Sequence, residues 1–175
     1  MKWITLLAVL LLGGASSYEI LSYASMETEY EEFQLLVEAM WYKVPAMDII
    51  EASVSLREPA DSLLYPAFFL RYPDGETTDI ANIPLEDLDC LGEGDTVSVK
   101  FYIWCHDFGG WSIFIFNDID NVFERIGRTE LDYPVGEWAV IVMDRETEAV
   151  VAELPLYVAI SKPVGRSKRL AAEMD

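Results

Sequence analysis

Residues 95–117, DTVSVKFYIWCHDFGGWSIFIFN, decide the fold that this sequence predicts. Two runs of β-branched and aromatic residues flank residues 106–110, where glycines supply the positive φ angles that a tight turn needs. The pattern therefore predicts a β-hairpin. Because both of its strands are rich in apolar side chains, we expect the hairpin to lie at the centre of the molecule.

The two strands of this hairpin divide their faces differently. On the first strand, Val97, Val99, Phe101, Ile103 and Cys105 form a purely apolar face, and Ser98, Lys100, Tyr102 and Trp104 form a mixed one. On the second strand, Trp111, Ile113 and Ile115 alternate with Ser112, Phe114 and Phe116. We expect the purely apolar face to point into the core. The second strand has few polar positions, so it is predicted to lie inside a sheet with both faces largely covered.

Alternating patterns predict further strands on either side of the hairpin. They cover residues 48–56 and 63–72, a weaker stretch at 77–83, and a final hairpin at 138–142 and 150–160 around the polar turn 144–148. About seven short strands with turn residues between them predict a mainly β chain, folded as an antiparallel β-sandwich.

Two short helices are predicted within this mainly β chain. Residues 28–31, TEYE, have the form of a capping box, and apolar residues then recur at roughly helical spacing over residues 29–42. A strand is the competing interpretation, because residues 35–42 are apolar enough to be buried on both faces. The second helix covers residues 118–126, with Asp118 as its N-cap and Gly127 as its stop.

The final hairpin carries a likeness to known proteins. Its strands contain PVGEWAV at residues 134–140 and AELPLYV at residues 152–158. This pair resembles the closing hairpin of exported immunoglobulin-like domains, which often end with a Pro-x-Gly-x-Trp strand and a polar turn. The resemblance implies an immunoglobulin-like β-sandwich and an adhesive, accessory or envelope-associated role. The widely spaced cysteine pair of antibody domains is absent, so no antibody-type function is implied.

The first 17 residues have the composition of an export signal. Lys2 is followed by an unbroken apolar run over residues 3–12 and by small residues at 13–17. Ten apolar residues extend about 15 Å as a helix, roughly half the thickness of the hydrocarbon layer. We therefore expect a cleaved signal peptide, no membrane insertion after cleavage, and a secreted or cell-surface protein. A buried N-terminal helix and an uncleaved anchor are the alternatives.

The predicted organisation has four parts. They are a signal peptide at residues 1–17, an N-terminal segment with the first helix at 18–47, a β-sandwich domain at 48–160 and a flexible basic tail at 161–175. The tail carries Lys162, Arg166, Lys168 and Arg169, and it is interpreted as a frayed terminus. The alternative is that this basic segment docks on its own acidic domain or on a neighbouring copy.

The charge balance limits the classes of partner. The chain has 31 acidic and 12 basic residues, a net charge of −19 at neutral pH. A strongly anionic surface repels phosphate, so nucleic-acid binding and electrostatic docking on anionic lipid are not expected. Cations or basic partners would be favoured. An acidic surface that keeps the protein soluble in its habitat is the alternative explanation.

Cysteines, a histidine and aspartates are the residues of this chain that could carry chemistry. Cys90 and Cys105 are a possible disulfide of an exported protein, but a hairpin strand would separate them by about 30 Å unless the preceding segment runs back along it. His106 lies beside Asp107 without a nucleophile context, so no catalytic or zinc role is predicted. Asp118 and Asp120 are weak calcium candidates, because the glycine and distal glutamate of a calcium loop are missing. Paired carboxylates for hydrolysis would need a separation that a sequence does not define.

The aromatic residues near the hairpin turn form a possible contact surface. They are Tyr102, Trp104, Phe108 and Trp111, and exposed rings at a loop end could bind a carbohydrate or a protein partner. Burial in the core is the alternative for the same rings.

Taken together, these patterns favour a non-enzymatic exported β-sandwich that acts as a binding, adhesion or envelope-structural module without a cofactor. A secreted hydrolase or enzyme accessory subunit that uses carboxylates is one alternative, and a calcium-dependent extracellular module is another.

Overall fold

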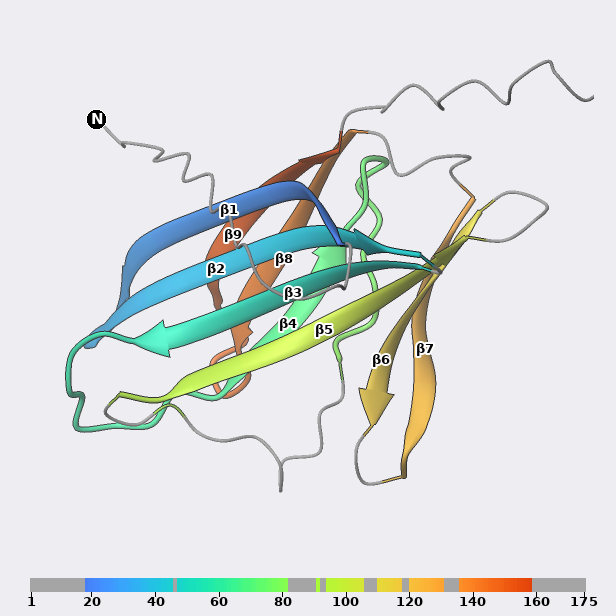
Figure 1. Ribbon diagram of the computed structural model, residues 1–175. Helices are drawn as coiled ribbons and strands as arrows, with labels where there is room; N and C mark the ends of the chain where they lie inside the picture. Colours follow the sequence, from blue (N-terminus) through green and yellow to red (C-terminus); the bar gives the residue numbers. More distant parts are fainter. Residues whose placement is uncertain are drawn as a thin grey trace, which may run out of the picture.

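Two antiparallel β-sheets form the protein in the computed structural model (Figure 1). The structure describes residues 18–45, 47–81, 91, 94–105, 110–117, 120–130 and 136–158. The predicted signal peptide at residues 1–17 and the predicted tail at residues 161–175 lie outside this part of the chain. Within the described ranges, no helix has the length and apolarity that a membrane crossing would require.

The larger sheet has six strands and the smaller sheet has three. The six-stranded sheet has the order β1 (Glu19–Tyr30), β2 (Phe33–Val44), β3 (Met47–Leu56), β5 (Thr96–Cys105), β6 (Trp111–Asn117) and β7 (Val122–Thr129). The three-stranded sheet has the order β4 (Pro66–Arg71), β8 (Gly136–Asp144) and β9 (Val150–Val158). The chain therefore leaves the large sheet after β3, forms β4 and returns to pair β5 with β3.

One hydrophobic core draws on the inward faces of both sheets. Strict alternation on β2 buries Phe33, Leu35, Val37, Ala39 and Trp41, and the neighbouring strands do the same with β-branched and aromatic residues. At the centre, Trp138 of β8 packs edge-on against Trp41 at 5.1 Å and against Tyr72 at 5.2 Å between ring centroids. These rings join the two sheets.

The two sheets are also joined along their edges. Thr78 N–H donates to the Leu70 carbonyl of β4, and Asp79 N–H donates to the Ile126 carbonyl of β7, so residues 76–81 bridge one edge of each sheet. On the other side, β1 lies beside β9, and the Tyr157 N–H donates to the Ser22 hydroxyl at 3.0 Å. One edge strand of each sheet, β1 and β9, thus lies against the other.

Several predicted strands are confirmed. The central hairpin is formed by β5 and β6, with Cys105 opposite Trp111. Its second strand, β6, lies inside the large sheet between β5 and β7 as predicted, but its outward face is only partly covered, since Phe116 is 38% exposed. Residues 48–56 fall in β3, residues 63–72 contain β4, and β8 and β9 form the final hairpin. Residues 77–81 of the weaker predicted strand hydrogen-bond beside β4 without forming a regular strand.

The predicted helix at residues 29–42 is wrong. This segment ends β1, turns at Glu31 and Glu32, and continues as β2, so the competing strand interpretation is confirmed for residues 35–42. The alternation was hidden because Leu36, Met40 and Tyr42 are apolar although they point away from the core. As a result, residues 18–47 supply β1, β2 and the start of the large sheet, and they are not a helical appendage.

The predicted helix at residues 118–126 is also wrong. Asp120 and Asn121 lie in the turn between β6 and β7, and Val122 already begins a strand. Asn121 adopts a left-handed backbone with φ of 54°, which suits a hairpin turn. A register shift opposite Ile113 and Phe114 removes the simple alternation from β7, and therefore its apolar residues recurred at a spacing that resembled a helix.

Candidate functional site

The aromatic residues predicted to share one contact surface are divided between the two sides of the sheet. Tyr102 and Trp104 point outward from the large sheet, and Trp104 is 50% exposed. Trp111 points into the core and is 8% exposed, with no partner for its indole N–H among the described residues. Phe108 lies outside the described residues. The alternative of burial thus holds for Trp111 and does not hold for Trp104.

The strand register brings the outward residues of six strands into rows. One row runs across all six strands as Ile20, Tyr42, Ile49, Tyr102, Phe114 and Arg125. Shorter rows flank it. On one side lie Tyr23, Met40, Glu51 and Lys100, and the pair Phe116 and Phe123 follows on β6 and β7. On the other side lie the pair Val44 and Met47, and Trp104 and Arg128 on either side of the buried Ser112. We call these three rows, together with Tyr18, the aromatic face.

Rings contact one another at both ends of the aromatic face. Tyr18 packs edge-on against Tyr42 with centroids 5.9 Å apart. Phe123 packs against both Tyr102 and Phe116, with centroids 5.0 Å apart in each pair. Tyr18, Trp104 and Phe123 remain 46%, 50% and 55% exposed. The rings are therefore held in place by neighbours while a large part of each stays accessible to a partner.

The charges on the aromatic face are few. Lys100 Nζ lies 3.6 Å from Glu51 Oε2, and the Tyr42 hydroxyl donates to the same carboxylate oxygen at 3.4 Å. Burial, followed by the charge of Glu51, raises the pKa of Tyr42 to about 12, so its hydroxyl remains a donor at physiological pH. Arg125 and Arg128 add positive charge on β7. On a chain with a large acid excess, this face is apolar and locally cationic.

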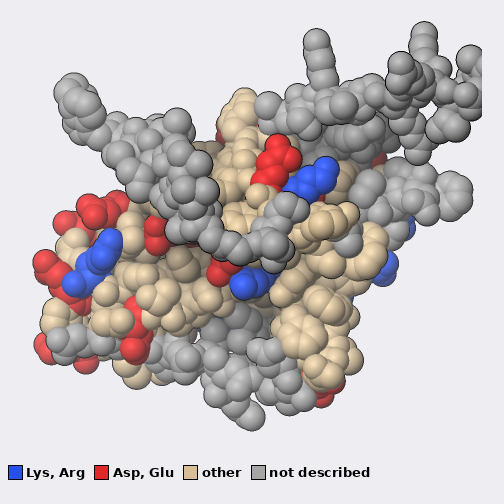
Figure 2. Space-filling view, viewed as in Figure 1, with Lys and Arg blue, Asp and Glu red and all other residues tan. Residues whose placement is uncertain are grey.

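The rest of the same sheet surface is polar. Toward the β1–β2 turn, the outward residues are polar except for Leu36. They include Glu38, which accepts from the Tyr23 hydroxyl at 2.6 Å, and Ser25, Glu27, Gln34, Ser53, Ser55 and Ser98. Figure 2, in the orientation of Figure 1, shows acidic side chains gathered at the left, where β1 turns into β2. The outer side of the small sheet is crossed by the Arg71–Glu153 ion pair, which spans β8. The aromatic face is thus a distinct region of the surface.

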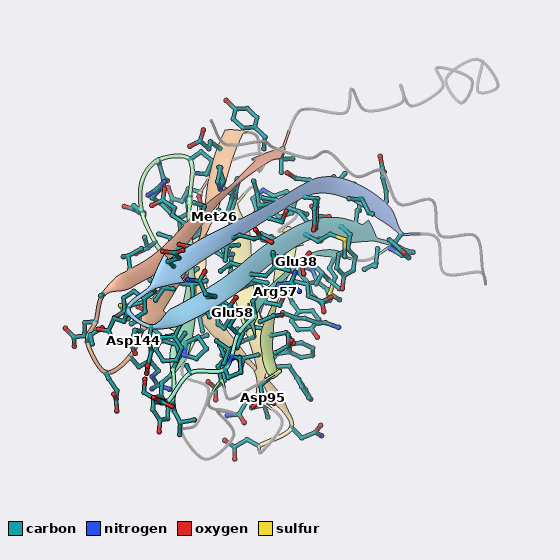
Figure 3. All side chains as sticks on the ribbon, turned by 90° about the vertical axis from the view of Figure 1, so that its left-hand side faces the viewer. Met26, Glu38, Arg57, Glu58, Asp95 and Asp144 are labelled. Carbon is teal, nitrogen blue, oxygen red and sulfur yellow. The ribbon has the colours of Figure 1, made fainter. Side chains whose placement is uncertain are left out.

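Among the described residues, two aspartates are buried, and they lie at opposite ends of the sandwich. Asp48 accepts from Trp41 Nε1 at 3.2 Å, next to Lys43 in the register. Burial raises the pKa of Asp48, while the Trp41 hydrogen bond lowers it in part. Asp144, seen from the acid-rich end in Figure 3, accepts from Tyr30 Oη at 3.0 Å and Thr147 Oγ1 at 2.9 Å.

The length of β2 separates these two carboxylates. Tyr30 pairs with Phe33 at one end of β2, and Asp48 pairs with Lys43 ten residues further on. At about 3.3 Å per residue the separation is about 33 Å, whereas paired catalytic carboxylates of glycosidases lie roughly 5–10 Å apart. Asp48 and Asp144 therefore cannot act as such a pair. Asp144 instead orders the β8–β9 turn through Glu146 N–H, which donates to it at 3.1 Å.

The calcium candidates are only partly described. Asp120 is exposed and belongs to a hairpin turn in which the Asn117 amide donates to its carboxylate at 3.3 Å and accepts from its backbone N–H at 3.2 Å. Asp118 lies outside the described residues. Within the described part of the chain, no group of three or more His, Cys, Asp or Glu side chains is placed to hold a metal ion. The calcium hypothesis stays a prediction.

The cysteine and histidine hypotheses fall outside what the structure describes. Cys90, His106 and Asp107 are not among the described residues, and Cys105 is described only through its backbone in β5. The disulfide between Cys90 and Cys105 and the absence of a role for His106 therefore stay predictions.

Sequence reasoning missed most of the aromatic face. The sequence places Tyr18 in the N-terminal segment, Tyr42 in the predicted first helix and Phe123 in the predicted second helix. The sequence did contain one indication of this face. Tyr102 and Trp104 alternate with the core residues of β5, and Phe114 and Phe116 alternate with the core residues of β6, so these four side chains point to the same outer side. What the sequence did not contain was the register that sets β1, β2 and β7 beside these strands.

Comparison with known proteins adds no relative. No protein-family model matches the chain, and searches of the curated proteins and of the solved structures find no significant match.

Proposed function

We propose that this protein is a non-enzymatic β-sandwich that works by binding through its aromatic face, as an adhesion or envelope-structural module. The observation that carries the proposal is the aromatic face. Tyr42, Tyr102 and Phe114 lie in its central row. Tyr18, Trp104 and Phe123 lie beside that row and are about half exposed. An exposed apolar patch that is bordered by polar residues often marks the site where a soluble protein meets a partner. The module binds a protein or a carbohydrate and needs no cofactor.

Export is part of the same proposal. Residues 1–17 have the charge, apolar run and small-residue end of a signal peptide, which supports a secreted or cell-surface location. An envelope or extracellular module would meet its partner at the surface of the cell. The acid excess of the chain would keep such a module soluble there and would discourage contact with nucleic acid.

The immunoglobulin-like likeness is a finer proposal. It is supported by the final hairpin of β8 and β9, which carries the Trp138 of the Pro-x-Gly-x-Trp pattern in the core. The division into six and three strands differs from the four and three strands of a constant-type immunoglobulin domain. The proposed binding function does not depend on this likeness.

Site-specific photo-cross-linking in the producing cells tests the function. A benzoylphenylalanine replaces Trp104 on the aromatic face in one variant and Tyr157 in a matched control, since Tyr157 is 67% exposed on β9 of the other sheet. We expect a discrete cross-linked product from position 104 and none from position 157. Absence of any product at position 104 would contradict binding through this face.

A second measurement tests the non-enzymatic part of the proposal. The purified full chain is assayed on generic ester, peptide and glycoside substrates, and we expect no turnover above background. Reproducible turnover that is abolished by one carboxylate substitution would instead favour the hydrolase alternative.

A further inference from the structure

We propose that the partner of the aromatic face is a second copy of this chain, packed sheet against sheet about a two-fold axis that runs parallel to the strands between β3 and β5. The inference rests on the function proposed above, because it names the partner of the same face. It is drawn from the register of the outward residues, which makes the face complementary to itself.

The geometry of such an axis determines which residues meet. A two-fold axis parallel to the strands and lying between the two sheets keeps the position of each residue along its strand and exchanges left with right. Residues of β3 on one copy then face residues of β5 on the other, at the same level. The cross-strand partners within one chain therefore become the facing partners between two chains.

This rule places the charges of the face in complementary positions. Glu51 is the register partner of Lys100, so each Glu51 faces the Lys100 of the second copy. In one chain, the two side chains form a pair at 3.6 Å and remain 35% and 46% exposed. In the dimer, two glutamates and two lysines alternate around the axis, so that every charge has opposite charges on two sides. Such a network is stronger than an isolated surface pair.

The same rule brings apolar residues against apolar residues. Ile49 faces Tyr102, and Tyr42 faces Phe114, because each pair occupies one row on opposite sides of the axis. One step further out, Arg125 on β7 faces Ile20 on β1, close to the ring of Tyr18. An arginine beside an exposed tyrosine ring gains a cation–π contact. The placement leaves no like charges opposed among Glu51, Lys100 and Arg125.

The extent of the face suits a dimer. Six strands about 4.8 Å apart and three rows about 6.6 Å apart cover roughly 29 Å by 20 Å, a planar area of about 600 Å² on each copy. Two copies together would bury about 1,200 Å², which exceeds the roughly 1,000 Å² that a specific interface needs. Aligned packing of two sheets keeps strand directions within about 30°, as this axis requires.

The net charge of the chain predicts how salt acts on the dimer. Two copies of a chain with a net charge of −19 repel each other at long range, whereas the facing surfaces are apolar or oppositely charged. Added salt screens the long-range repulsion and leaves apolar contact intact. Association is therefore expected to strengthen as salt rises, which is the reverse of what a partner held mainly by charge attraction would show.

Sedimentation equilibrium of the full chain over a wide range of concentrations tests the inference. We expect a monomer–dimer equilibrium that shifts toward dimer with added salt. Lys100→Glu and Glu51→Lys each place four like charges around the axis, and each should weaken dimerisation roughly tenfold or more. The double variant Glu51→Lys with Lys100→Glu restores alternating charges and should recover the wild-type dissociation constant.

The controls separate this inference from the proposed function. Arg57→Glu makes the same change in net charge as Lys100→Glu at an exposed residue beyond the end of β3, and it should leave dimerisation unchanged. Circular dichroism confirms that each variant is folded. Wild type that stays monomeric, or dimers unaffected by both single reversals, would overturn the inference. The photo-cross-linking experiment gives a further test. A cross-linked product from the Trp104 variant with the mass of two chains supports the dimer. A product of any other mass refutes the dimer, while the proposed binding function stands.

Discussion

Gly127 of β7 has no side chain, and this leaves room for the buried ring of Tyr72 between the two sheets. A Cβ atom at this position would lie 2.1 Å from the Tyr72 hydroxyl oxygen and 2.9 Å from Thr78 Cγ2. Tyr72 and Thr78 are both buried, so neither can move into solvent. We expect Gly127→Ala to reduce the free energy of unfolding by about 1–3 kcal/mol, the usual range for overpacking. Urea denaturation monitored by tryptophan fluorescence measures the change.

A double-mutant cycle with Tyr72→Phe identifies the cause. The Tyr72 hydroxyl has no hydrogen-bond partner among the described residues, and burial raises its pKa. Removing this hydroxyl therefore costs little and relieves the contact with the new methyl group. Tyr72→Phe should restore part of the stability lost in Gly127→Ala. Strict additivity of the two substitutions would show that the Tyr72 contact is not the reason for the loss.

Asp48 links stability to pH. Because burial raises the pKa of its carboxyl in the folded state, the folded protein binds this proton more readily than the unfolded chain. The ionised carboxylate therefore opposes folding. Its penalty is absent below the unfolded pKa of about 3.9, grows as pH rises through the folded pKa, and is constant above it.

Asp48→Asn tests this sign. The asparagine oxygen can still accept from Trp41 Nε1, so the variant should be more stable than wild type at neutral pH, and the difference should disappear at acid pH. Glu27→Gln makes the same charge change at an exposed position and serves as the control. Urea midpoints over a pH series give the result. A difference that is independent of pH, or one that matches Glu27→Gln throughout, would contradict the assignment.

At the level of elements, residues 76–81 hold the two sheets together at one edge. Thr78 donates its N–H to the Leu70 carbonyl and accepts the Leu70 N–H on Oγ1 at 3.0 Å, so its side chain continues the ladder of β4. Thr78→Val keeps the shape and leaves the buried Leu70 N–H without an acceptor. We expect a loss of about 1–3 kcal/mol.

Hydrogen exchange locates the effect of Thr78→Val. The Leu70 amide should lose protection more than amides in the β2–β3 ladder, since only the former loses its acceptor. Thr78→Ser, which keeps the hydroxyl, is the matched control and should preserve the protection of Leu70. Equal loss of protection in both ladders would indicate global destabilisation in place of a weakened edge.

At the level of the whole molecule, net charge should govern the response to salt. With 31 acidic and 12 basic residues, like charges repel across the folded surface, and screening reduces this repulsion. We therefore expect the melting temperature to rise with sodium chloride. Calcium chloride at matched ionic strength should give the same rise if the ion acts only by screening.

The salt comparison also tests the calcium alternative. A specific site at Asp118 and Asp120 would stabilise the folded state by mass action, so calcium would raise the melting temperature beyond sodium at the same ionic strength. Asp120→Asn would remove that excess. Dilute protein is used so that dimerisation does not contribute to the melting temperature.

The sequence by itself determined the mainly β class, the central hairpin of β5 and β6, and the final hairpin of β8 and β9. In these strands one face is apolar, and glycine or polar residues mark the turns. The alternation with a period of two residues can therefore be recognised in the sequence alone. Val99, Phe101 and Ile103 were expected in the core, and they are buried there.

Only the tertiary structure decided that β2 and β7, whose sequences have helix-like spacing of apolar residues, are strands. It also decided that they complete the aromatic face. β2 and β7 carry apolar residues on their outward sides, such as Met40, Tyr42 and Phe123, so burial and hydropathy do not coincide in them. Cross-strand register, which depends on segments far apart in the chain, sets Tyr42 and Phe123 in rows with Tyr102 and its neighbours. The aromatic face exists only once that register is formed, because its residues come from six strands and no single segment contains it.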